Sequence, residues 1–389
     1  MDVQGIAAIV FILLMAAFLY YNRKKITMQG IFFPLLYFVM LKSQLGIKSM
    51  DYIAKKFPRL LSFLGTLGVI AGFIGMAFIC YELVKNTVYL FVRPDIAAGV
   101  QPVLPFEAKG VFFVPFIYWI ISIFVIAIVH EFSHGMMARV HGLKVKSSGF
   151  AFLGIILPLV PAAFVEPDEK ALVKKSARAQ LSVYAAGPFA NVVMAGLMIL
   201  LVTFVGAPIA KAAFEPMGVK VVSAVQDGPF YNAGIQPDEI VTQIEGMNII
   251  YVANLTKALE KYKPGQRIFV KTNVSAYTVE LGKNPKNESK PYIGIGSRQY
   301  TEPKKEFVAQ YGSFVPAVIT WIIGLVYWLF ILNLGIGLFN LMPIGPIDGG
   351  RMLKLACQKI HTKKGEFVFK AISLFFLAVV LFNVVAGFV

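Results

Sequence analysis

The sequence predicts a multi-pass α-helical membrane protein with about six transmembrane helices, a short interfacial or re-entrant helix, a membrane-associated β hairpin or loop, and an inserted α+β domain. Hydrophobic residues make up 57% of the 389 positions and the mean hydropathy is +0.70, which is typical of membrane proteins. Apolar stretches of bilayer-spanning length recur along the chain. They are interrupted once, at residues 208–312, by a polar segment in which strand and turn patterns alternate.

The charge distribution also indicates a membrane environment. The chain carries 37 Lys and Arg against 21 Asp and Glu, a formal charge of +16. Many of these basic residues flank the apolar stretches, where they satisfy the positive-inside rule and contact anionic lipid. We therefore expect the lipid bilayer as a partner and no nucleic acid. The two cysteines, Cys80 and Cys357, do not suggest a disulfide or a pair of zinc thiolates.

The N-terminal transmembrane region covers residues 1–110. Its first apolar span, residues 4–21, is followed at once by basic residues, which predicts an uncleaved helix with its N-terminus outside. Residues 30–41 are apolar but too short to span and contain Pro34, so we expect a short interfacial or re-entrant helix there. Residues 60–83 form the next predicted span.

The first half of the catalytic membrane core is predicted at residues 111–207. Residues 111–129 contain no charged side chain and lead directly into His130-Glu131-Phe132-Ser133-His134. On a helix, the two histidines at i and i+4 project from one face and can offer two neutral nitrogen ligands to zinc. Glu131 can then take a proton from a water molecule at the metal. Histidines hydrogen-bonded to neighbouring helices are the alternative, but ionisable groups inside a membrane usually mark a functional site.

Residues 149–168 follow this helix and read as an irregular segment. Gly154, Pro158 and Pro161 break any helix, and the β-prone pieces between them predict a short hairpin or loop at the membrane edge. Irregular backbone at that depth needs shielding by protein or a water-filled cavity. Residues 179–206 form another span, whose small residues and proline permit close helix packing.

The polar segment at 208–312 has the size of one small domain. An amphipathic helix is predicted at residues 253–262, ended by Pro264-Gly265. Strands are predicted at residues 219–225, 238–246, 266–272 and 277–281.

The second half of the catalytic core is predicted at residues 313–350 and contains an apolar span over 314–342. Residues 351–389 are expected to form a basic loop, 351–364, and a last transmembrane helix, 367–388.

The basic residues predict which segments face the cytoplasm. Counting Lys and Arg places residues 22–59, 139–178 and 351–364 on the cytoplasmic side. The histidine pair and Asp348 then lie near the cytoplasmic ends of their helices, and the polar domain lies on the extracytoplasmic side. Asp348 is therefore the best candidate for a third zinc ligand, although an aspartate at a helix end can also be a cap or a solvated turn residue.

Four motifs in order resemble those of the site-2 proteases, which are intramembrane zinc metalloproteases. They are HEFSHG (130–135), PAAFVEPD (161–168), AAGPFAN (185–191) and NLMPIGPIDGG (340–350). The resemblance spans residues 112–350 and implies that His130, His134 and Asp348 coordinate one zinc ion per chain and that Glu131 is the general base. It also implies that Asn340 helps to hold the substrate or the transition state. Ile347 stands where the family pattern usually has leucine, and this changes no ligand.

The inserted domain resembles a single PDZ domain. Met217-Gly218-Val219 looks like the start of a carboxylate-binding loop, and residues 228–240 and 263–270 also fit the family. The resemblance implies a groove, with Gly218 and Val219 in it, that binds a peptide or a protein C-terminus by strand addition. A β-rich module that only spaces or shields the helices is the alternative.

The expected function is endoproteolysis of transmembrane segments of membrane-anchored substrates, known as regulated intramembrane proteolysis. A helical substrate must unwind before attack, and the freed backbone groups need new partners. We expect the 149–168 segment to pair with the unwound substrate, with Phe152 and Leu153 in the pairing stretch and Asn340 on the other side.

Other functions fit the sequence less well. A prenyl-protein-type membrane protease would need a glutamate ligand on a helix downstream of His134, and the apolar spans offer none. An ion-coupled transporter would show repeated halves with broken helices, which the sequence lacks. An inactive scaffold that binds protein tails through the PDZ-like domain would not need Glu131.

Overall fold

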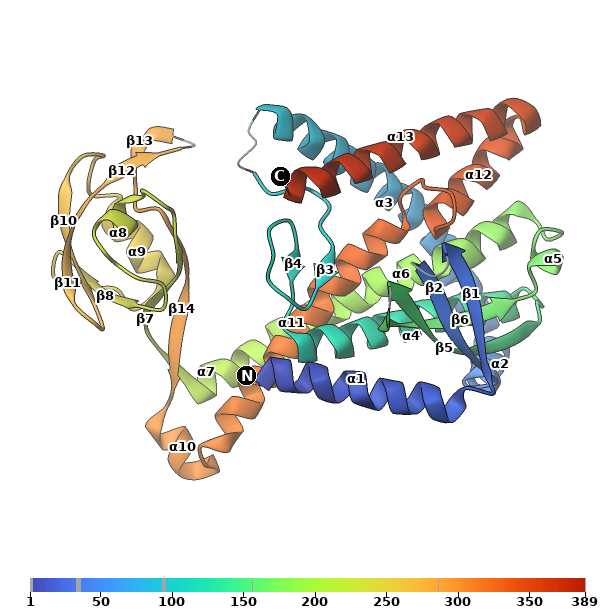
Figure 1. Ribbon diagram of the computed structural model, residues 1–389, viewed down its shortest axis with the longest axis horizontal. Helices are drawn as coiled ribbons and strands as arrows, with labels where there is room; N and C mark the ends of the chain where they lie inside the picture. The colour runs from blue at the N-terminus through green and yellow to red at the C-terminus, as the bar shows by residue number, and fades with distance from the viewer. Residues whose placement is uncertain (1–2, 33–35, 93–95, 156, 286, 389) are drawn as a thin grey trace. The chain divides into compact units, whose positions relative to one another are not determined.

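The computed structural model describes residues 3–32, 36–92, 96–155, 157–285 and 287–388 (Figure 1). The chain divides into two compact units. One, called the membrane unit below, comprises Met1–Val202 and Ile323–Val389; the other, the polar unit, comprises Thr203–Ile322.

Six helices in the described residues are long and apolar enough to cross a bilayer. Their segments are Gln4–Asn22, Pro58–Val92, Phe116–Val140, Ala177–Ala213, Phe314–Asn340 and Thr362–Phe388. They correspond to α1 (Val3–Asn22), α3 (Pro58–Val92), α4 (Phe116–Val140), α6 (Ala177–Leu201) with its continuation, α11 (Phe314–Asn340) and α13 (Thr362–Phe388). The prediction of a multi-pass helical membrane protein with about six spans is confirmed.

The membrane unit also contains a four-stranded antiparallel sheet in the order β1-β2-β5-β6. The strands are β1 (Ile26–Phe32), β2 (Leu36–Ser43), β5 (Val145–Ile155) and β6 (Leu157–Pro167). β5 and β6 pair as antiparallel strands in the stretch 149–168, which was predicted to be a short hairpin or loop. Figure 1 shows this sheet beside α4, and the main chain of β6 is hydrogen-bonded to an α4 side chain, as described below.

The short helix expected at residues 30–41 is wrong, because the described part of this stretch is extended; residues 33–35 lie outside the described residues. β2 pairs with β5 along its whole length, from Leu36 opposite Ile155 to Ser43 opposite Ser148. This pairing satisfies the backbone of a segment that is too short to span as a helix, and its aromatic and β-branched residues favour a strand. The partner strand lies more than a hundred residues away in sequence, so local patterns could not reveal it.

The basic loop expected at residues 351–364 is also wrong, because α12 (Asp348–Ile360) occupies most of it and α13 begins at Thr362. α12 is amphipathic. Met352 is fully buried in a cluster with Met76 and Leu341, whereas Arg351 and Lys354 are exposed. Burial of one apolar face therefore makes this basic segment helical.

Short elements complete the membrane unit. They are α2 (Ile47–Lys56), the two-residue strands β3 (Val103–Leu104) and β4 (Phe112–Phe113), and α5 (Glu169–Leu172). α2 packs Ile47, Met50 and Ala54 inward. Its Asp51 forms an ion pair with Arg139 near the end of α4, which joins the two helices.

The polar unit is built on a sheet whose main path is β11-β10-β8-β7-β14, with β9 paired to β8. Its core contains Phe230, Ile244 and Val270, all essentially inaccessible to solvent. The predicted strands and the predicted helix of this region are present as β7, β8, β10, β11 and α9. The strands and helices are β7 (Phe214–Ala224), α8 (Pro229–Asn232), β8 (Ile240–Ile244), β9 (Met247–Asn248), α9 (Val252–Leu259), β10 (Arg267–Thr272), β11 (Ala276–Glu280), β12 (Gly282–Asn284), β13 (Asn287–Tyr292) and β14 (Ile295–Pro303). A π-helical turn (Val202–Gly206) with α7 (Ala207–Ala213) precedes them, and α10 (Lys305–Tyr311) follows.

Candidate metal centre and active site

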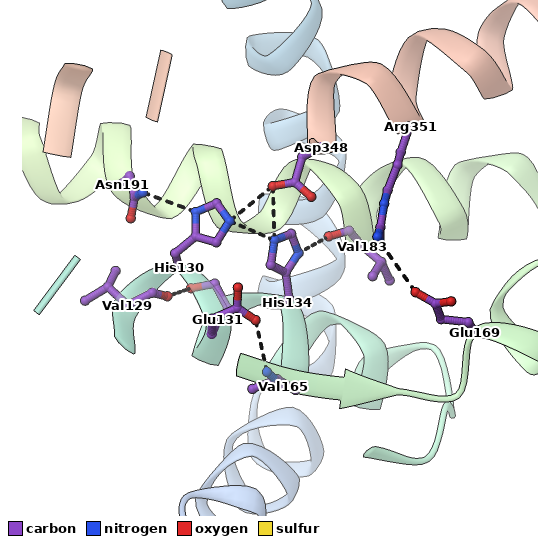
Figure 2. Close-up of polar contacts among 11 residues, drawn as sticks. Val129, His130, Glu131, His134, Val165, Glu169, Val183, Asn191, Asp348 and Arg351 are labelled. Atoms are coloured by element: carbon purple, nitrogen blue, oxygen red, sulfur yellow. Dashed lines mark hydrogen bonds and ion pairs between the residues drawn. The ribbon is translucent and has the colours of Figure 1, made fainter. Parts of the chain in front are cut away.

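Two histidines project from the same face of α4 into the membrane unit. The imidazole rings of His130 and His134 have centroids 4.7 Å apart. Their Nε2 atoms lie 3.1 Å apart, so both rings present the same type of nitrogen to one point (Figure 2). This is the arrangement expected for residues one helical turn apart on a metal-binding helix.

Asp348 reaches the same point from the first turn of α12. Its Oδ2 lies 3.1 Å from His130 Nε2 and 3.3 Å from His134 Nε2. The preceding turn folds back tightly on the start of α12: a Cβ added at Gly349 would lie 2.6 Å from the Met342 carbonyl oxygen. Glycine is therefore required where the turn and the helix meet, and this close approach aims Asp348 at the histidines.

The three groups fit a zinc ion. Tetrahedral ligand atoms at about 2.0–2.1 Å from zinc lie roughly 3.3 Å from one another. The separations observed here, 3.1, 3.1 and 3.3 Å, match that value. The side chains are only 12–13% exposed. Within the described ranges, His130, His134 and Asp348 are the only group of three or more potential ligand residues close enough to share a metal ion.

The outer nitrogens of both rings contact α6. His134 Nδ1 lies 2.7 Å from the Val183 carbonyl oxygen, which can only accept a hydrogen bond. His134 therefore carries its proton on Nδ1 and leaves Nε2 free as a ligand. On the other ring, His130 Nδ1 lies 3.2 Å from Nδ2 of Asn191, a residue that is fully buried (Figure 2).

Gly187 explains how α6 comes so close to the histidines. A Cβ added at this position would lie 2.6 Å from His130 Nε2, so a side chain would occupy the space in front of the ligand atoms. The AAGPFAN motif was expected to permit close helix packing and to belong to the family pattern, but no role was predicted for Val183, Gly187 or Asn191. The motif itself was visible, but nothing local in it shows that it faces the histidines.

Glu131 points away from the ligand cluster towards β6. Its Oε2 accepts a hydrogen bond of 3.0 Å from the backbone N–H of Val165 (Figure 2). Glu131 also lines a cavity of about 490 Å³ together with the two histidines and Asp348. A carboxylate beside a metal position, within a cavity that can admit water, has the placement of a general base.

Other walls of this cavity come from α11, α6 and α12. Asn340, the last residue of α11, lines it. Arg351 lines it as well; its guanidinium lies 3.7 Å from Glu169 Oε1 and 5.9 Å from the centre of the Tyr184 ring. Asn340 and Arg351 are thus polar donors that face the same space as the candidate catalytic groups. A larger cavity of about 740 Å³, between α3, α11 and α13, has mainly apolar walls and contains none of the candidate catalytic residues.

The assignment of Phe152 and Leu153 to substrate pairing does not agree with the sheet. Both residues lie on β5, which is paired on both sides: Phe152 is opposite Val39 on β2 and Pro161 on β6. Phe152 is also buried. A strand with two partners cannot accept a third, whereas β6 is the end strand of this sheet in the described part of the chain.

Gly218 and Val219 are likewise misplaced as groove residues. They lie on β7, an interior strand, and Val219 is opposite both Gln299 on β14 and Val241 on β8. The Gly218 carbonyl accepts a hydrogen bond of 2.9 Å from the Gln299 side chain. The end strand beside β7 is β14, some eighty residues later in the sequence, so the motif at 217–219 marked the wrong strand.

Comparison of the sequence with known protein families assigns the chain to one of them. The sequence profile of peptidase family M50 matches residues 118–384, more than half of the chain and from the histidine pair to beyond Asp348. The chain belongs to this family. Its recognition as a site-2 protease from four motifs is confirmed, and this M50 member is a membrane protein of the metalloprotease type.

Individual relatives are distant. An uncharacterised protein of Methanocaldococcus jannaschii is 25% identical over 343 residues, which cover 86% of this M50 chain and 81% of the relative. The zinc metalloprotease RasP of Shouchella clausii is 23% identical, with 53% of this chain and 59% of RasP aligned. Among solved structures, the PDZ domain of an SdrC-like protein from Listeria monocytogenes is 20% identical and covers 21% of this chain and 87% of its own, with a TM-score of 0.19. A TM-score this low does not establish a shared fold.

Proposed function

We propose that this M50 protein is a zinc-dependent intramembrane endoprotease that cleaves transmembrane segments of membrane-anchored proteins. The observation that supports this most strongly is the convergence of two imidazole Nε2 atoms and the Asp348 carboxylate at separations of 3.1–3.3 Å inside a helix bundle. Glu131, next to the first histidine, faces the same cavity. A metal ligand set with an adjacent carboxylate is the donor set of a metalloprotease.

His130, His134 and Asp348 would hold one zinc ion. A bound zinc ion would supply Lewis-acid chemistry, lowering the pKa of a water molecule towards about 7 and polarising the scissile carbonyl.

Glu131 then performs the proton transfers. Its carboxylate takes one proton from the attacking water, whose oxygen forms a bond to the scissile carbonyl carbon. When the C–N bond breaks, Glu131 returns that proton to the leaving amine nitrogen, so the reaction consumes one water molecule and leaves the carboxylate unchanged. Asn340 supports this chemistry from the end of α11, where it lines the cavity and its side-chain amide can donate a hydrogen bond to the oxygen on which charge develops.

The substrate needs an extended conformation at the site, and β6 is the strand that can provide it. In an antiparallel pair, the N–H and C=O of one residue point to the same side. The N–H of Val165 bonds Glu131, so the backbone N–H and C=O of Val165 point away from β5. The backbone polar groups of Ala163 and Pro161, at alternate positions along β6, point to the same side. The open side of β6 therefore offers the carbonyls of these residues and the N–H of Ala163 to an unwound substrate strand.

The sidedness follows from the basic residues and forms part of the proposal. The active site lies near the cytoplasmic side and the polar unit lies on the extracytoplasmic side. The polar unit is proposed to be PDZ-like and to bind a peptide or protein C-terminus, with β14 in place of β7 as the strand that accepts it. A catalytically inactive scaffold that only binds protein tails is the second candidate, and it predicts no role for Glu131.

The test is co-expression of candidate single-pass membrane proteins with either the wild-type chain or Glu131→Gln. The amide keeps the size of the side chain but cannot accept the proton, so cleavage should fall by about 10²–10⁴-fold. Fragments that appear with the wild type and disappear with Glu131→Gln identify substrates. Cleavage by Glu131→Gln within tenfold of the wild-type rate would refute the general-base assignment.

A further inference from the structure

Asn191 contacts a candidate metal ligand, and its function is not explained by helix packing. It lies on α6 with no exposed surface, and its Nδ2 is 3.2 Å from His130 Nδ1. Its Oδ1 is buried, and no described residue offers it a hydrogen bond. A fully buried amide with one unsatisfied polar atom costs free energy, so its presence at this position requires an explanation.

The chemistry of His130 determines which atom of the amide must face it. Nε2 of His130 is the atom that lies 3.1 Å from both Asp348 Oδ2 and His134 Nε2, so Nε2 is the ligand atom. A neutral imidazole that binds metal through Nε2 carries its proton on Nδ1 and is a donor there. An amide nitrogen facing this N–H would place two donors together. The metal-binding tautomer therefore requires the amide oxygen of Asn191 at this position.

The two ring contacts then form a matched pair. His134 donates its Nδ1 proton to the main-chain carbonyl of Val183. The structure has Asn191 Nδ2 beside His130 Nδ1, and exchanging the nitrogen and oxygen of this amide lets His130 donate its Nδ1 proton to the side-chain oxygen. Oxygen and nitrogen of a terminal amide have nearly the same shape, so a half-turn of the amide within its cavity is sterically neutral and its hydrogen-bond partners decide the orientation. Both acceptors belong to α6, eight residues apart, so one helix orients both rings.

We propose that Asn191 is a positioning residue of the metal centre. Its side-chain oxygen accepts the Nδ1 proton of His130 and so fixes the tautomer and ring orientation that present Nε2 to the metal. The inference rests on the proposed zinc site and extends it by one residue. Acceptors behind metal-binding histidines typically contribute 10–100-fold to metal affinity.

The experiment measures metal binding by the full-length chain in detergent, with Zn²⁺ competed against a chromophoric chelator and Co²⁺ absorption reporting the ligand geometry. Asn191→Leu keeps the volume and removes the acceptor, so zinc affinity should fall 10–100-fold and the Co²⁺ spectrum should change. Asn191→Asp keeps an acceptor and has no donor, so its affinity should stay within about threefold of the wild type. A packing role would predict the reverse order, since a buried carboxylate disturbs packing more than leucine does.

Asn333 supplies the matched control. It is also fully buried in a membrane helix, hydrogen-bonds the Leu329 carbonyl of its own helix at 2.7 Å, and has no contact with either histidine. Because no hydrogen bond joins Asn333 to a described histidine, Asn333→Leu should leave zinc affinity unchanged. Equal zinc affinity of Asn191→Leu and the wild type would overturn the inference, as would an Asp variant as weak as the Leu variant. Zinc binding by the wild type is measured separately from cleavage, so a failure of the inference and a failure of the proposed protease function give different results.

Discussion

At the scale of single residues, the candidate site depends on the lack of a side chain at Gly187 as well as on the candidate ligands. Gly187 lets α6 pass directly in front of the two imidazoles. The same helix then places Val183 and Asn191 against the outer ring nitrogens. Ligand geometry is thus set by residues on a different helix from the histidines.

Gly187→Ala should disrupt this geometry. The added Cβ would lie 2.6 Å from His130 Nε2, closer than atoms can approach, so the rings or α6 must shift. We expect zinc occupancy of the purified protein to fall at least about tenfold, the lower end of the effects seen when the support of ligand histidines is disturbed.

Gly196 gives a control on the same helix. A Cβ added there meets no described atom within 4 Å, and alanine is the better helix former. Gly196→Ala should therefore bind zinc as the wild type does. Normal zinc occupancy in Gly187→Ala would show that α6 does not approach the metal position as closely as described.

The sequence could single out the residues that converge at the candidate metal centre, because the two histidines have metal-ligand spacing on one helix. His130, Glu131 and His134 form a local pattern, and Asp348 was singled out as the polar group expected at the same depth. Val183, Gly187 and Asn191 could not be predicted, because their function arises only when α6 packs against α4. Helix-to-helix register is a tertiary property that no periodicity in either helix encodes.

At the scale of secondary-structure elements, the four-stranded sheet leaves one strand on which we propose that a substrate is received. β5 is paired with a strand on each side, and β6 is the end strand of the sheet within the described residues. Pro161 lies on the open side of β6 and has no N–H, and the N–H of Val165 is bonded to Glu131. Ala163 lies between them, and we propose that its N–H binds an incoming strand.

Ala163→Pro tests this directly. Proline removes that N–H while leaving the bonds between β5 and β6 intact, since end strands tolerate proline. Loss of one hydrogen bond, about 0.5–1.5 kcal/mol, should slow cleavage about two- to tenfold without changing zinc content. Ala163→Val keeps the N–H and is the control. If Ala163→Pro and Ala163→Val cleave at the same rate, β6 does not pair with the substrate through this residue.

The strand edge also shows where sequence patterns fail. Proline and glycine correctly indicated that residues 149–168 are not helical, because these residues break helices locally. The partner β2 was taken for a helix, since its strand character depends on β5, which follows more than a hundred residues later. For the same reason, Gly218 and Val219 were predicted to lie in a peptide-binding groove. The pairing of β7 with β14 shows that this edge of β7 is already occupied.

At the scale of the whole molecule, the candidate catalytic residues and the polar unit belong to separate parts of the chain. His130, Glu131, His134, Asn340 and Asp348 all lie in the membrane unit. The expected domain limits, 208–312, lie within the polar unit, Thr203–Ile322. The polar unit folds around its own hydrophobic core, so it needs no residue of the metal centre to be stable.

Deletion of residues 208–312, with a flexible linker between the flanking helices, should therefore leave about one zinc ion per chain and change which substrates are cut. Zinc content and fragment patterns of the deletion and the full-length protein make the comparison. A deletion variant that is monodisperse in detergent yet has lost all zinc would show that the polar unit is part of the catalytic core.

The central claim is that His130, His134 and Asp348 form a zinc site served by Glu131, and the zinc content of purified protein tests it most directly. Elemental analysis should give about one zinc ion per chain for the wild type and for Glu131→Gln, because a glutamine at 131 removes the base but no ligand. Asp348→Ala removes one of three ligands and should bind far less. Wild-type levels of zinc in Asp348→Ala, or no zinc in the wild type, would contradict the account.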